Sequence, residues 1–162
     1  MINIRDLRDC VVLPTLTHLG LKYATTAAVQ LVMATGLHES NLTYLRQLHR
    51  GPAKGVWQME PATFSDLYTN YLNYPRNSDL AARVEETASR FPKGASQMEG
   101  NLYYACAMCR VLYYRRPEPL PPADDAEAMG AFYKAHFNTS KGKATVAGFI
   151  ETWNEFVRPL YN

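Results

Sequence analysis

The chain of 162 residues is 47% apolar and 20% charged, with a formal net charge of +2, which fits one globular domain spanning residues 1–162. So small a charge, without a basic stripe, excludes electrostatic binding to nucleic acid as the main function. No stretch approaches the roughly 20 apolar residues of a membrane helix, so we expect no membrane insertion.

The N-terminal segment predicts a short helix or an extended start over residues 4–13, closed by Pro14. Charged residues occur through its first nine positions, and the apolar patch that follows is short. This pattern differs from a signal peptide. We therefore expect a protein that is synthesised and held in the cytoplasm unless something other than a cleaved signal carries it across the membrane.

The next segment predicts a buried central helix over residues 19–37, because apolar side chains occupy nearly all of its faces. The polar run that follows places Glu39 as a lone acid at the end of this helix. Its neighbour His38 is expected at the edge of the following loop, since adjacent residues of a helix point about 100° apart. Residues 41–49 predict a further helical turn, and residues 47–60 are the one place where a small β-hairpin fits.

Helical spacing of apolar residues predicts five more helices after that loop. They cover residues 61–72, 79–91, 97–115, 123–137 and 146–158, the last one stopped by Pro159. Strand-like alternation is nearly absent. The sequence therefore predicts a mostly α fold.

Three cysteines form an odd set, which argues against a disulfide framework. Cys106 and Cys109 are spaced as C-x-x-C, but they lie in an apolar run and no histidine cluster is near. We interpret them as small core residues rather than metal or redox ligands. No metal and no cofactor are expected.

Two short motifs follow one another near the central helix. Glu39-Ser40 ends the helix, and Gly55-Val56-Trp57-Gln58-Met59-Glu60-Pro61-Ala62-Thr63 follows the loop. This order resembles the lysozyme-like lytic transglycosylases of the SLT group, whose pattern is Glu-Ser, then GLMQ-apolar-x-P-x-T, then a late Tyr-Asn pair. The resemblance implies a lysozyme-like α fold over about residues 20–155, and the lack of a signal-peptide pattern suggests a phage-encoded member.

The later elements match less closely. Gly100 and Tyr103 align with a family helix, and the Tyr-Asn pair would be Phe137-Asn138 or Phe132-Tyr133. Phe137 lacks the hydroxyl that the family places near its catalytic acid, and Tyr133, one helical turn earlier, could supply it. The loop between Ser40 and Gly55 is also shorter than the family's.

Glu39 is the candidate catalytic residue. Burial against apolar groups raises the pKa of a carboxyl and keeps it protonated for delivery to a glycosidic oxygen, as it does for the catalytic glutamate of a lysozyme. The resemblance implies that one acid suffices, because the same group then deprotonates the muramyl 6-hydroxyl and a 1,6-anhydro product forms. We expect Glu60, the other acid of the motif, to be solvated.

The remaining site residues are assigned to substrate binding. Gln58 would hydrogen-bond sugar groups, and Ser40 would bridge Glu39 or the substrate. Trp57 is either a sugar-stacking floor or a core tryptophan, and Asn138 is either a sugar contact or a helix cap. Met59, Tyr133 and Phe137 complete the predicted set.

The sequence thus predicts a peptidoglycan-cleaving glycosidase acting on the MurNAc-GlcNAc β-1,4 bond. Its partners would be glycan strands of the bacterial wall and other virion or tail proteins of a phage. It would act in the periplasm or at the wall, as a virion component, an endolysin or an enzyme of a secretion machine. The alternative is a non-catalytic virion adaptor that keeps a lysozyme-like fold.

Overall fold

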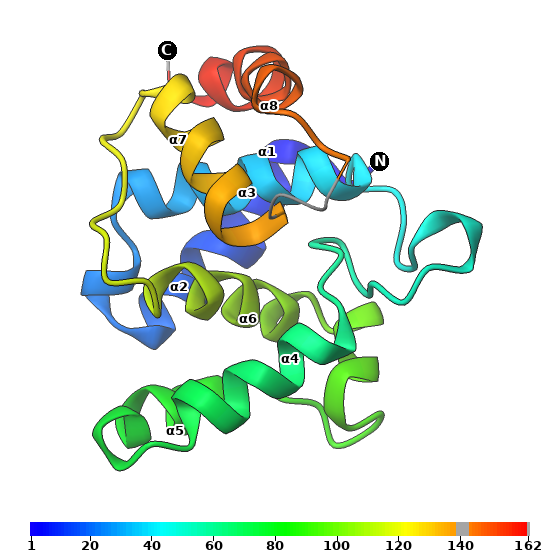
Figure 1. Cartoon of the computed structure of the whole chain (residues 1–162), viewed down its shortest axis with the longest axis vertical. Helices are drawn as coiled ribbons and strands as arrows, with labels where there is room; N and C mark the ends of the chain where they lie inside the picture. Colours follow the sequence, from blue (N-terminus) through cyan, green and yellow to red (C-terminus); the bar gives the residue numbers. More distant parts are fainter. Residues whose placement is uncertain (139–142, 162) are drawn as a thin grey trace.

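The computed structural model describes residues 1–138 and 143–161. Helices and helical turns make up most of these residues, and no strand occurs among them. The predicted mostly α class is confirmed. Figure 1 shows α3 (Thr26–Ser40) near the middle, with α7 and α8 above it and α6, α4 and α5 below.

The first helix is longer than predicted. It combines α1 (Ile4–Asp6), a π-helical segment (Leu7–Val12) and α2 (Leu13–Leu19) without a break. Pro14 therefore does not close it. The amide of Leu13 bonds the Arg8 carbonyl five residues earlier, and Pro14 stands at the start of the α segment, where its missing N–H costs little.

Helix α3 begins later than predicted, because the first helix ends at Gly20. This glycine has a φ of 132°, which other residues rarely adopt. A 3-10 turn at Leu21–Tyr23 follows. Thr25 then caps α3 by accepting from the Ala28 amide at 3.3 Å, a frequent N-cap interaction. The prediction of a buried central helix is confirmed, with its bounds moved from 19–37 to 26–40.

The predicted helix over 61–72 is confirmed as α4 (Pro61–Leu67) and its π-helical extension (Tyr68–Leu72). Helix α5 (Ser78–Glu86) stops before the predicted residue 91, and Phe91 is 89% exposed. A 3-10 turn (Gly94–Glu99) precedes α6 (Leu102–Tyr114).

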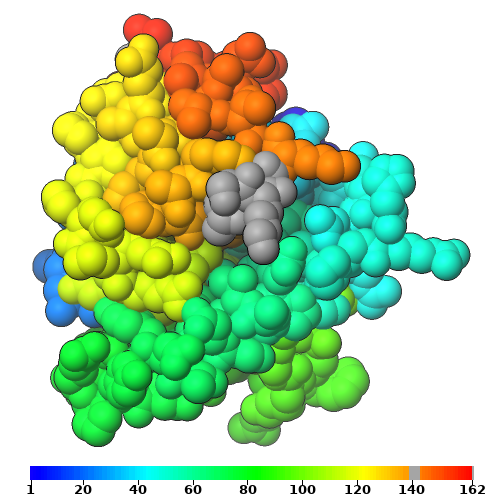
Figure 2. All heavy atoms as spheres, in the orientation of Figure 1, coloured from blue at the N-terminus to red at the C-terminus, as the bar shows by residue number. Residues whose placement is uncertain are grey.

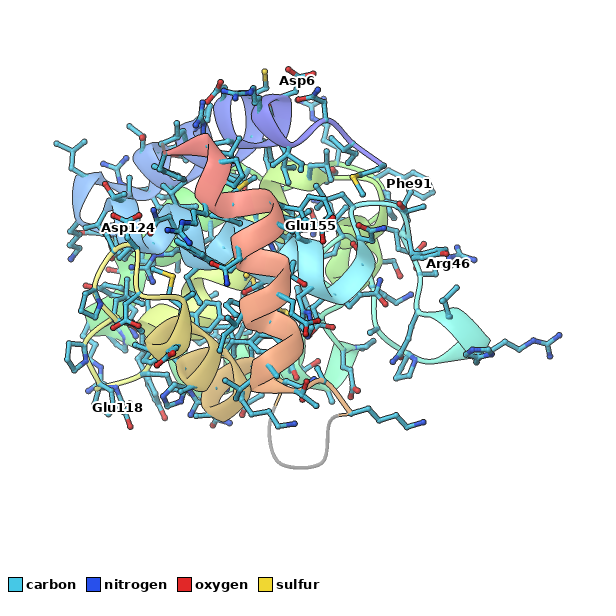
Figure 3. The ribbon with its side chains drawn as sticks, turned by 90° about the horizontal axis from the view of Figure 1, so that it is seen from above. Asp6, Arg46, Phe91, Glu118, Asp124 and Glu155 are labelled. Carbon is cyan, nitrogen blue, oxygen red and sulfur yellow. The ribbon has the colours of Figure 1, made fainter. Side chains whose placement is uncertain are left out.

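The last two helices carry π-helical or 3-10 extensions. Helix α7 (Ala126–Tyr133) continues as Lys134–Asn138, and α8 (Val146–Thr152) continues as Trp153–Val157 and Arg158–Leu160. Seen from above in Figure 3, α8 crosses the upper face of the molecule over α3, which it contacts. The predicted turn after Asn138 lies partly outside the described residues, from 139 to 142.

The predicted hairpin is reduced to two isolated antiparallel bridges, Arg46 with Lys54 and Lys54 with Met59. Between them the chain forms a 3-10 turn (Leu48–Arg50), and this loop protrudes on the right in Figures 1 and 2. Figure 2 shows α4 and α5 in green along the lower part of this face and α7 and α8 along the upper part.

One apolar core joins all of these helices, and residues from α3 and α6 supply much of it. Cys106 and Cys109 are buried there as predicted core residues, while Cys10 is exposed. Within the described residues, no group of His, Cys, Asp and Glu is arranged to hold a metal ion. Over the same part of the chain, none of the helices combines the length and apolarity that a membrane span requires.

Candidate active site

Glu39 lies in the last turn of α3, where the helix meets α7. Its side chain is partly buried, and its Oε1 accepts a hydrogen bond from the Tyr133 hydroxyl at 2.5 Å. Burial raises the pKa of this carboxyl from about 4.5 to about 7, although the Tyr133 hydrogen bond acts in the opposite direction. A carboxyl of this kind is largely protonated below neutral pH and can exchange its proton near neutrality.

Tyr133 reaches Glu39 because the end of α7 packs against the end of α3. Its ring is fully buried and stacks on Phe149, with 4.8 Å between ring centroids. Burial and the Glu39 charge both raise the pKa of the Tyr133 hydroxyl, so it stays protonated and donates. Of the two positions the sequence offered, Tyr133 is the one that contacts the acid.

Phe137 and Asn138 lie one turn beyond Tyr133. The Phe137 ring stacks on Tyr133, with 6.0 Å between ring centroids, and packs on Tyr113 at 5.6 Å, so it helps to hold the Tyr133 ring in place. Asn138 Oδ1 accepts from Lys134 Nζ at 2.8 Å, and its side chain is also a hydrogen-bond partner of the Tyr133 hydroxyl. Asn138 therefore reaches Glu39 only indirectly, through Tyr133.

The segment that carries Gln58 folds into a tight turn. The Lys54 and Met59 backbones exchange hydrogen bonds of 3.0 and 3.1 Å, and Gly55 between them has a φ of 73°. A Cβ at Gly55 would lie 2.3 Å from the Met98 carbonyl oxygen, so this position requires glycine. Gln58 is itself left-handed, at φ 47°, and its Nε2 donates to the Gly55 carbonyl at 2.8 Å.

Trp57 attaches this turn to α3. It is 1% exposed, and its Nε1 donates to the Val32 carbonyl at 2.9 Å. A Cβ at Gly36 would approach this Nε1 to 3.1 Å. The turn is therefore fixed on α3 at Val32 and Gly36, about two and about one helical turns before Glu39.

Trp57 thus matches its core alternative and offers no free face to a sugar. Met59, at 3% exposure, is a core residue as well. Ser40 is buried, and its Oγ donates to the Gly36 carbonyl at 3.1 Å and accepts from the Leu42 amide at 3.2 Å. These three side chains hold the end of α3 and the turn in place, so the prediction that they contact substrate is corrected to a positioning role.

The prediction for His38 is also corrected. It does not lie at a loop edge, because it is half-buried between α7 and α8. Its Nδ1 is 3.2 Å from Thr152 Oγ1, its ring meets the Tyr133 ring edge-on at 5.4 Å, and burial lowers its pKa. In the sequence, only its place next to Glu39 indicated that His38 would pack near Tyr133.

Glu60 is exposed, as expected, and directly precedes α4. The pKa of Glu39 is shifted by its own burial and by Tyr133. The site therefore presents, within the part of the chain that the structure describes, a carboxyl that holds its proton up to about pH 7 and a tyrosine that donates to it. Such a group can act as an acid and, once deprotonated, as a base.

Two cavities of the described structure lie away from this carboxyl. One, of about 550 Å³, is lined by residues 122–127 with Ile150 and Asn154. The other, of about 440 Å³, lies around Arg110. Comparisons with protein-family models, with curated protein sequences and with solved structures find no match for this chain.

Proposed function

We propose that the protein is a glycosidase that cleaves the MurNAc-GlcNAc β-1,4 bond of peptidoglycan, with Glu39 as its acid and base. The observation that carries the proposal is the Glu39 carboxyl, whose burial raises its pKa to about 7 while Tyr133 donates to it. An acid with a pKa near the working pH transfers protons most efficiently. The Glu39-Ser40 and Gly55–Thr63 motifs support the same function by their resemblance to lytic transglycosylases.

In the proposed reaction Glu39 gives its proton to the glycosidic oxygen, and the bond from that oxygen to the MurNAc anomeric carbon breaks. GlcNAc leaves with a new 4-hydroxyl, and the MurNAc ring carries the positive charge. The Glu39 carboxylate then takes the proton of the muramyl 6-hydroxyl, whose oxygen bonds to the anomeric carbon. Glu39 is protonated again, and the Tyr133 hydroxyl can donate to it in both states.

This scheme needs no second carboxylate and no water, which agrees with an exposed Glu60. A hydrolytic lysozyme would normally use two carboxyl groups. We therefore favour the lytic transglycosylase reaction, with glycan strands of the wall as substrate. The chain would act in the periplasm or at the wall, as a phage virion component, an endolysin or part of a secretion machine.

The test is mass spectrometry of muropeptides released from purified sacculi. The wild type should release products with 1,6-anhydromuramyl ends, and Glu39→Gln should release none while keeping the helical circular dichroism of the wild type. Reducing ends would indicate hydrolysis instead. Equal release by Glu39→Gln and the wild type would refute the role of Glu39.

A second candidate is a non-catalytic adaptor that keeps the fold. It is favoured by the position of the two cavities, since the residues that line them do not include Glu39. A sedimentation assay with purified sacculi separates the two functions. Wall binding by the wild type without any released muropeptide would establish the adaptor.

A further inference from the structure

The cavity of about 440 Å³ lies at the opposite end of α3 from Glu39. Thr25, the N-cap of α3, lines it, and 14 residues at 1.5 Å each place Thr25 about 21 Å along the helix from Glu39. In Figure 1 this region is at the left edge, where the loop after α6 runs beside the segment leading into α3. The cavity is therefore separate from the candidate active site.

A buried cation lines this cavity. Arg110, in the middle of α6, is 2% exposed, and its Nε donates to the Tyr23 carbonyl at 2.9 Å. Its Nη1 is buried without a hydrogen-bond partner among the described residues. In the same part of the chain, no carboxylate forms an ion pair with it. Arginine stays protonated in proteins, so this charge lacks a counter-charge.

Two more cations line the same cavity. Lys22 Nζ lies 5.1 and 5.7 Å from the ring centroids of Tyr23 and Tyr114, and Arg116 has a buried Nε without a partner among the described residues. Glu118 is the acid of the lining; its side chain is 55% exposed, and its carboxylate is 4.0 Å from His136. Figure 3 shows Glu118 at the periphery. Three cations against one acid leave the lining with a net charge of +2.

The beginning of α3 adds to this positive potential. The 15 residues of α3 direct the positive end of the helix dipole toward Thr25. The Thr25 hydroxyl already accepts from the Ala28 amide, so its own hydrogen is available to donate. A hydroxyl, a helix N-terminus and two guanidinium groups are donors that suit a phosphate.

We infer that this cavity binds a small organic phosphate, with its phosphate group toward Arg110 and Thr25. The volume of about 440 Å³ is in the range of sites for organic ligands, roughly 300–1,000 Å³, and exceeds what a bare phosphate needs. Tyr114, Pro119 and Leu120 line the cavity too, and they provide an apolar wall for the rest of the molecule. This inference does not depend on the proposed function.

The test is isothermal titration calorimetry at constant ionic strength, with phenyl phosphate and inorganic phosphate as probes. Phenyl phosphate should bind the wild type more tightly than inorganic phosphate does. Arg110→Met should weaken phenyl phosphate binding by roughly tenfold or more, as expected for a lost charge-assisted hydrogen bond. Lys22→Gln should weaken it by roughly threefold, since this cation is exposed.

Lys93→Gln is the matched control, because it removes the same charge from an exposed lysine that does not line the cavity. It should bind phenyl phosphate like the wild type, and so should Glu39→Gln. Unchanged binding by both Arg110→Met and Lys22→Gln would overturn the inference, as would an absence of binding to the wild type. Equal affinity for the two probes would overturn the part that concerns the organic group.

Discussion

Ionisable groups are buried near both ends of α3, and burial affects them in different ways. Glu39 belongs to α3, and Arg110 comes from α6. At the C-terminal end of α3 Glu39 avoids the cost of a buried charge by retaining its proton, and its pKa rises to about 7. At its N-terminal end burial lowers the pKa of Arg110, but a guanidinium cannot lose its proton under ordinary conditions. Burial therefore creates an acid–base group at one end and a need for an anion at the other.

The largest expected effect concerns the rate of wall cleavage. Glu39→Gln removes the transferable proton, so the rate should fall by about 10²–10⁴-fold, the usual contribution of a general acid or base. The loss is measured as the rate of muropeptide release from purified sacculi. Glu60→Gln, which removes an exposed carboxylate of the same motif, should keep the wild-type rate.

The next effect concerns stability against pH. The pKa of Glu39 is raised on folding, so the folded state holds the proton more tightly and stability is lost as pH rises from about 4.5 through about 7. Relative to Glu39→Gln, the wild type should lose up to about 3 kcal/mol of unfolding free energy between pH 4 and pH 8. Urea unfolding of both proteins across this range measures it, and parallel curves would contradict the shifted pKa.

A smaller effect should follow from Tyr133→Phe. The Tyr133 hydrogen bond lowers the pKa of Glu39, so its loss should move the alkaline limb of the pH–rate profile to higher pH. The maximal rate should fall about tenfold, because a hydrogen bond to a charged group contributes about 1.5–3 kcal/mol. Tyr44→Phe, at an exposed tyrosine, is the control, and an unchanged limb would show that the contact with Glu39 is not made in solution.

The smallest effect should come from Arg110→Met in phosphate-free buffer. Replacing a buried charge that lacks a counter-charge by an apolar side chain of similar length is often neutral or stabilising. We expect an unfolding free energy within about 1 kcal/mol of the wild type or above it. A loss of several kcal/mol in thermal or urea unfolding would show that the protein itself already compensates Arg110.

The sequence predicted the parts of this molecule that depend on local pattern. Helical spacing located α3 and α4, and the i to i+4 relation between Tyr133 and Phe137 offered Tyr133 as one of two residues that could contact Glu39, which the structure then decides in its favour. The predicted helix bounds were wrong where a local backbone feature decided where a helix begins or ends. Gly20 delayed α3, and a π-helical segment before Pro14 let the first helix continue.

Long-range contacts were beyond the sequence. Trp57 could equally have been a surface or a core residue, and only its bond to the Val32 carbonyl decides between them. Arg110 stands in an apolar helix, where charged residues commonly extend to solvent. Its burial depends on Tyr23, from the distant segment before α3, whose carbonyl accepts from Arg110 Nε; Tyr114, which also packs on the guanidinium, lies one turn further along the same helix α6.

Because Trp57 is anchored on α3, the position of the neighbouring Gln58 does not depend on the length of the loop that precedes it. The Trp57 indole is attached to Val32, and Lys54 pairs with Met59 across the turn, so both constraints act downstream of the protruding 3-10 turn at Leu48–Arg50. Residues can therefore be inserted at that turn, as a fluorophore tag or an affinity peptide, without displacing the turn that carries Gln58.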